Sequence, residues 1–327
     1  MLNFLFNRFF QFLITLAGIT VLTFIIMHLA PGDPSDIQSN LNPKISLEAK
    51  ENLRKLYGLD QPLPIQYFNW VRRLMTFDFG TSFSDGKSIS LKIVERLPIT
   101  IAINALSLLL IFAAAIPFGI LGAARQNSFF DNAATFLVFI GFAVPTFWLA
   151  LLLMILFGVQ LGWVPISGFQ SIDTDGFTLW MKLKDWSLHL LMPVLVSAFG
   201  GLAGFSRYLR SEMLEVVRQD YIRTAYAKGL SENRVLYKHA FRNALIPLVT
   251  ILGLSVPGLI GGSVIFENIY AIPGIGQLFY QSVMQRDYPL VMGLTVIGGL
   301  LTMTGNFLAD ISVALVNPRI KVTGGNG

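Results

Sequence analysis

The sequence contains no cysteine and few charged residues. Of its 327 residues, 0 are cysteine and 3 are histidine, and 13% are charged against 54% that are hydrophobic. The absence of cysteine excludes disulfides, thiol catalysis and cysteine-ligated metals. Soluble domains carry about 25% charged residues, roughly twice the share found here. The composition therefore predicts a protein that crosses a membrane several times.

Motifs that would mark an enzyme or a nucleotide site are missing as well. The sequence has no G-x-x-x-x-G-K-[ST] phosphate loop, no H-E-x-x-H zinc motif and no G-x-S-x-G nucleophile. The histidines His28, His189 and His239 lie far apart, so no metal site is expected. The net charge of +5 is better explained by basic inner loops than by nucleic acid. We expect neither catalysis nor a cofactor bound by the chain itself.

Six long apolar runs are each of about the length that a membrane-spanning helix needs. They cover residues 9–30, 99–124, 133–157, 188–205, 245–266 and 290–316. The first run is too long for the hydrophobic part of a signal peptide, and His28 stands where a small residue would precede cleavage. Arg and Lys gather in alternate short segments, which predicts that both ends of the chain are cytoplasmic.

These runs predict an all-α polytopic membrane protein with about six transmembrane helices. Residues 1–30 form the N-terminal segment and first span, and residues 31–97 form an external insertion with helices at 46–57 and 64–75. Residues 98–318 form the core transmembrane domain, which contains a cytoplasmic loop at 207–243. Residues 319–327 form a cytoplasmic tail.

The loop at 207–243 is basic, with eight Arg or Lys residues against four acidic ones up to residue 242. The spacing predicts a helix over residues 212–228, which Gly229 stops by adopting a left-handed conformation. Ser231 is expected to cap a second helix, which Pro247 interrupts or ends. On charge alone an ordinary inner loop is an equally good interpretation. A glycine break inside a structured loop favours a surface that docks onto a partner.

The residues of this loop carry a resemblance to a known family. Arg223-Thr224-Ala225, followed by Gly229 and then by residues 239–247, resembles the "EAA" loop of ABC-importer permeases. The match is closer to the dipeptide, oligopeptide and nickel permeases, in which this loop commonly reads R-T-A-x-A-K-G-L. Further stretches similar to that family lie at residues 31–34, 58–62, 78–82, 161–168 and 267–276.

The resemblance implies the fold of type I ABC-importer permeases and a peptide as substrate. It implies a second related permease chain, two ATP-binding subunits that hold ATP and Mg, and an external solute-binding protein. The location implied is a bacterial or archaeal cytoplasmic membrane. The alternatives are an ATP-independent secondary transporter or channel, a membrane assembly factor, and an importer of the same family for nickel or oligosaccharides.

In such permeases the loop forms a coupling helix that sits in a cleft of the ATPase. The residues that match it here are Arg223, Thr224, Ala225, Lys228, Gly229, Leu230, Ser231, Glu232 and Arg234. A second candidate region is residues 267–276, which are too apolar for a surface loop and too interrupted for one helix, so we expect a re-entrant or lid-like segment. The candidates for a translocation path or external gate are Pro145, Phe147, Glu267, Tyr270, Pro273, Gly274, Gly276 and Asp310. Pro145 alternatively marks a packing kink, and Asp310 a structural hydrogen bond.

Overall fold

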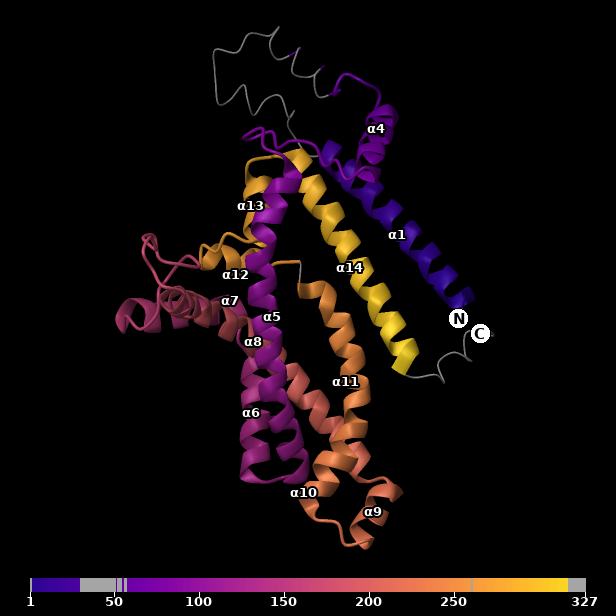
Figure 1. The fold of residues 1–327 in the computed structure, drawn as a ribbon, viewed down its shortest axis with the longest axis vertical. Helices are drawn as coiled ribbons and strands as arrows, with labels where there is room; N and C mark the ends of the chain where they lie inside the picture. Colours follow the sequence, from indigo (N-terminus) through magenta and orange to yellow (C-terminus); the bar gives the residue numbers. More distant parts are fainter. Residues whose placement is uncertain (1, 30–50, 52–54, 56–57, 260, 317–327) are drawn as a thin grey trace.

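The computed structural model describes residues 2–29, 51, 55, 58–259 and 261–316 (Figure 1). Its long helices are α1 (Leu2–Leu29), α4 (Leu63–Met75), α5 (Ile89–Ala124), α6 (Phe129–Ala143), α8 (Leu179–Val217), α11 (Phe241–Ser255) and α14 (Tyr288–Val316). Its shorter elements are α7 (Thr146–Leu153), η1 (Met154–Gln160), α9 (Asp220–Ala227), α10 (Glu232–Arg234), η2 (Val235–Ala240), η3 (Val256–Leu259), α12 (Val264–Ile269) and α13 (Ile275–Met284). Apart from an isolated bridge between Thr81 and Ser88, the described residues form no β-structure.

Helices α1, α5, α8 and α14 are each long and apolar enough to cross a membrane. The pair formed by α6 and α7 with η1 is a fifth candidate, bent by 99° at its break. The interruption predicted at Pro145 is confirmed, since α6 ends at Ala143 and Pro145 precedes the first residue of α7. Proline lacks the N–H that would continue the helical hydrogen bonds.

The prediction of a single span over residues 245–266 is wrong. Helix α11 ends at Ser255, a short 3-10 turn follows, and α12 begins only at Val264. Pro257 cannot donate to the helical ladder, and Gly262 has a φ of +63°, which no right-handed helix contains. The glycine-rich part of this run therefore turns the chain instead of extending the helix.

Helices α5 and α8 form the central pair and are longer than predicted. Helix α5 begins at Ile89 instead of residue 99, and α8 extends from Leu179 to Val217 instead of covering 188–205. Small residues allow their backbones to approach. A Cβ at Gly119 would lie 2.7 Å from Leu209, and one at Gly201 would lie 2.4 Å from Ile111. Pro98 and Pro117 lie inside α5 and Pro193 lies inside α8, so none of these prolines ends its helix.

Helix α1 packs along α14, and α4 lies over the C-terminal end of α1 (Figure 1). The amphipathic helix predicted at 64–75 is confirmed as α4, which buries Trp70 beside Phe24 and Tyr67. The helix predicted at 46–57 lies almost entirely outside the described residues, and the tail at 319–327 lies wholly outside them.

Candidate functional site

The basic segment forms the narrow end of the molecule, where α9 and α10 lie (Figure 1). The uninterrupted helix predicted over 212–228 is wrong, because α8 ends at Val217 and α9 begins at Asp220. Gln219 between them has extended backbone angles, φ −72° and ψ 148°. This break allows α9 to turn its apolar face towards the ends of α5 and α8.

Helix α9 has one buried face and one exposed face. Ile222 and Ala225 are 0% and 6% exposed, and they belong to a cluster with Leu209 and Met213 of α8 and Ile120 of α5. Residues of η2 and α11 complete this cluster, which we call the tip core. Its buried members are Ile120, Ala123, Leu209, Met213, Ile222, Ala225, Val235, Leu236, Ala240, Ala244 and Leu248. The tip core holds α9 rigidly against the two central helices.

The aromatic and charged side chains of α9 are exposed to solvent, with the two tyrosines flanking the buried face. Tyr221 and Tyr226 are exposed, and Tyr237 of η2 is 51% exposed nearby in the sequence. Arg223 and Asp220 form an ion pair at 3.7 Å, with both side chains mostly in solvent. Such an exposed pair contributes little to stability. Exposed tyrosine together with arginine is a composition that favours protein contacts.

Gly229 ends α9 in the predicted way. Its φ is +76°, and its N–H donates to the carbonyl of Tyr226 at 2.9 Å. No atom lies within 4 Å of where a Cβ would stand, so a side chain there would be opposed by backbone strain alone. Ser231 occupies the N-cap position of α10, but its side chain makes no capping hydrogen bond. The helix that follows widens into the π-helix η2, which the sequence patterns did not predict.

The predicted coupling residues divide between the two faces. Ala225 is buried in the tip core, and the partly buried Leu230 packs against this core, so neither side chain belongs to the exposed surface. The remaining residues are exposed: Arg223, Thr224, Lys228, Gly229, Ser231, Glu232 and Arg234.

A second polar cluster lies in the N-terminal third of α5, away from the tip core, where the predicted re-entrant segment folds into α12 and α13 (Figure 1). Glu267 of α12 is 4% exposed. Its carboxylate accepts hydrogen bonds from the Thr100 hydroxyl at 3.0 Å and from the backbone N–H of Gln277 at 2.9 Å. The Thr100 oxygen in turn accepts from the backbone N–H of Ile275 at 2.9 Å. Glu267 and Thr100 therefore join α5, α12 and the start of α13, and we call this group the Glu267 knot.

Glycine is required where α12 and α13 meet. A Cβ on Gly274 would lie 2.4 Å from the Glu267 carboxyl carbon, and one on Gly276 would lie 2.5 Å from the Ser263 carbonyl carbon. The sequence analysis identified Glu267, Gly274 and Gly276 as candidates, but it did not predict that they lie in contact. It missed Thr100, because one threonine in an apolar span is not a distinctive signal.

The other predicted path residues do not gather at one site. Tyr270 is buried, and its hydroxyl donates to the Ala150 carbonyl at 3.3 Å, which ties the segment to α7. Pro273, which precedes Gly274 in the sequence, is partly buried. Phe147 is exposed in the first turn of α7. Asp310 falls within α14, but its side chain lies outside the described part of the chain. The structure therefore brings together the residues of the Glu267 knot, but not all the residues predicted for the translocation path.

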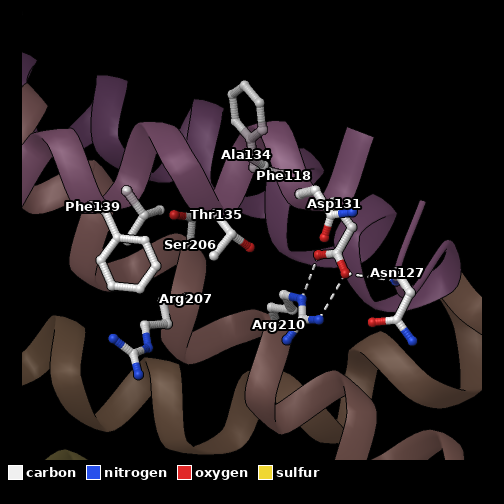
Figure 2. Close-up of a pocket in the computed structure, with 11 residues that line it drawn as sticks. Phe118, Asn127, Asp131, Ala134, Thr135, Phe139, Ser206, Arg207 and Arg210 are labelled. Atoms are coloured by element: carbon white, nitrogen blue, oxygen red, sulfur yellow. Dashed lines mark hydrogen bonds and ion pairs between the residues drawn. The ribbon is translucent and has the colours of Figure 1, made fainter. Parts of the chain in front are cut away.

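An ion pair that the sequence did not predict lies near the tip core. Asp131 at the start of α6 is 1% exposed and accepts two hydrogen bonds from the Arg210 guanidinium of α8, at 2.6 and 2.8 Å (Figure 2). The backbone N–H of Asn127 donates to the same carboxylate at 2.9 Å. Gly122 of α5 leaves room for the pair, since a Cβ there would lie 3.2 Å from an Asp131 oxygen. The two partners are 79 positions apart in the chain, which explains why the sequence spacing gave no signal.

Almost the whole chain is similar to known proteins. Residues 115–322 match the family described as binding-protein-dependent transport system inner membrane component, and residues 1–104 match the N-terminal part of the membrane component of such systems. The oligopeptide transport system permease protein AppB of Bacillus subtilis is 46% identical over 307 residues, which cover 94% of this chain and 95% of that protein. The dipeptide transport system permease protein DppB of the same organism is 36% identical over 323 residues, with coverage of 98% and 99%.

A solved structure shares the fold. One chain of the MetNI methionine ABC transporter, in an inward-facing conformation, superposes with a TM-score of 0.51 at 20% identity. The match covers 70% of this chain and 97% of that chain. This likeness, together with the helical architecture, confirms the fold class predicted from the sequence.

Proposed function

The chain belongs to the family of binding-protein-dependent transport system inner membrane components, and we propose that it is the permease subunit of an ATP-driven importer of di- or oligopeptides. The observation that carries the choice of substrate is the 46% identity to an oligopeptide permease over 94% of the chain. Nickel and oligosaccharides are the competing substrates within this kind of importer. The protein is an integral membrane protein, and in this proposal the end that carries α9 faces the cytoplasm.

The partners in this proposal are a second related permease, two ATP-binding subunits and an external solute-binding protein. ATP and Mg are bound by the ATP-binding subunits, and this chain contributes no ATPase site. The exposed face of α9, with Tyr221, Arg223 and Tyr226, is the surface that we assign to the ATPase. The start of α1 and the end of α14 both point away from α4 and α13, which supports cytoplasmic termini (Figure 1).

The packing supports a mechanical route from α9 to the far end of the molecule. Ile222 and Ala225 lock α9 to α5 and α8 through the tip core. Helix α5 is 36 residues long, about 54 Å at 1.5 Å per residue, so it extends well beyond a bilayer core of about 30 Å. In its N-terminal third Thr100 holds Glu267 and the start of α13. A displacement of α9 by the ATPases would therefore move the re-entrant segment together with α5.

Uptake by the reconstituted importer tests this function. The complete complex in liposomes, supplied with its binding protein, is expected to accumulate a labelled peptide with ATP inside the liposomes and not with a non-hydrolysable analogue. Excess unlabelled peptide should compete, whereas nickel and oligosaccharides should not. Peptide accumulation driven by an ion gradient without ATP would contradict the proposal in favour of a secondary transporter, and competition by nickel alone would contradict the choice of substrate.

A further inference from the structure

A cavity of about 290 Å³ lies between α6 and α8, close to the α5–α6 turn (Figure 2). Its mouth is lined by polar and charged side chains, among them Asn132, Thr135 and Arg207. A smaller cavity of about 90 Å³ adjoins it and is lined almost entirely by apolar side chains, including Leu137 and Phe199. The two share Phe118, Ala134, Val138 and Ser206, so together they form one groove with a polar mouth and an apolar interior.

The mouth of this groove carries an excess of positive charge. Asp131 and Arg210 neutralise each other through their two-point ion pair. Arg207 lies one helical turn before Arg210, is exposed, and forms no ion pair with any of the described residues. One cation is therefore left at the mouth to attract an anion.

The position of the groove favours a ligand from the membrane. Helices α6 and α8 both belong to candidate spans, and Phe136 and Phe142 of α6, which do not line the groove, are exposed. The polar mouth lies at the first turns of α6, where a span would meet the aqueous interface. Basic pockets between transmembrane helices on the cytoplasmic side are suited to anionic lipid head groups.

We propose that this groove binds an anionic phospholipid of the cytoplasmic leaflet, with its phosphate at Arg207 and part of an acyl chain between α6 and α8. The proposal rests on the proposed function in one respect, namely that the α9 end faces the cytoplasm. The ligand lies beside the Asp131–Arg210 pair and close to the tip core. It would hold α6 against α8 at the place where the ATPases act.

A photoactivatable phosphatidylglycerol, incorporated at low fraction into phosphatidylcholine nanodiscs that hold the complete importer, tests this site. Adducts identified by mass spectrometry are expected on peptides from α6 and α8. Arg207→Gln should lower their yield about five-fold, in line with the loss of one basic residue at a membrane surface. Ala134→Phe, which fills the groove and keeps every charge, should lower the yield as well. Arg125→Gln removes an exposed cation from the same end outside the groove and should leave the yield unchanged.

Several outcomes would overturn the proposal. They are an equal yield with a photoactivatable phosphatidylcholine, no effect of Arg207→Gln and Ala134→Phe, or adducts that fall on the second permease instead of this chain. Competition by millimolar inorganic phosphate would indicate a free-anion site instead of a lipid site. Co-purification of the ATP-binding subunits is measured in the same samples. If they are present while the site fails, the lipid proposal fails alone, and if they are absent from the wild type, the proposed function fails.

Discussion

Replacing Asp131 by alanine is expected to lower the free energy of unfolding by about 3 kcal/mol, because it leaves Arg210 without its counter-ion. Arg210 is 30% exposed on its side chain and regains some hydration, which places the expected loss at the low end for a buried pair. The Asn127 N–H also loses its acceptor. Equilibrium unfolding in micelles with increasing sodium dodecyl sulfate would measure the change.

The matched control is Asp220→Ala, which breaks the solvent-exposed pair with Arg223 and should change stability by less than about 0.5 kcal/mol. The double variant Asp131→Leu with Arg210→Met should recover part of the loss, because apolar side chains of similar volume often replace a buried ion pair without penalty. Equal effects of Asp131→Ala and Asp220→Ala would contradict a structural role for the buried pair.

Gly276→Ala is expected to destabilise the protein by about 1–3 kcal/mol through overpacking and to reduce peptide uptake strongly. The added Cβ would lie 2.5 Å from the Ser263 carbonyl carbon and 2.6 Å from the Val264 nitrogen. These are backbone atoms, so α12 and α13 must separate. That separation would strain the hydrogen bond from Gln277 to Glu267 and loosen the Glu267 knot.

Gly298→Ala in α14 is the matched control, because both glycines are helical and differ in the space around them. No atom lies within 4 Å of a Cβ at Gly298. There the substitution should be neutral or stabilising by up to about 1 kcal/mol, since alanine favours helix more than glycine does. If the Gly276→Ala and Gly298→Ala variants have the same uptake and the same stability, the close approach of α12 and α13 is not required for function.

Features that depend on neighbouring residues were predictable from the sequence. Apolar length alone located α1 and α14, amphipathic spacing located α4, and the need for a left-handed residue identified Gly229. The break at Pro145 followed from its missing N–H. In these cases the local preference and the tertiary environment favour the same structure.

Features that depend on distant residues were not predictable. The break between α8 and α9 exists because Ile222 and Ala225 gain burial against α5, and no glycine or proline near residue 218 signals the end of a helix. The run at 245–266 is apolar enough for a span, yet the chain turns there so that the Glu267 segment can reach α5. The Asp131–Arg210 pair joins residues far apart in the chain. The residue types of the candidate site could therefore be identified, but not which of them touch.

We expect the exposed face of α9 to contact the ATPase, and the absence of cysteine makes this contact directly testable. Single cysteines at Tyr226, in α9, and at Met284, at the opposite end in α13, can each carry a photoreactive maleimide without any background labelling of this chain. In the active importer, Tyr226→Cys is expected to cross-link to an ATP-binding subunit, and Met284→Cys is not. A complex that transports peptide but cross-links to the ATPase from Met284→Cys and not from Tyr226→Cys would contradict the account.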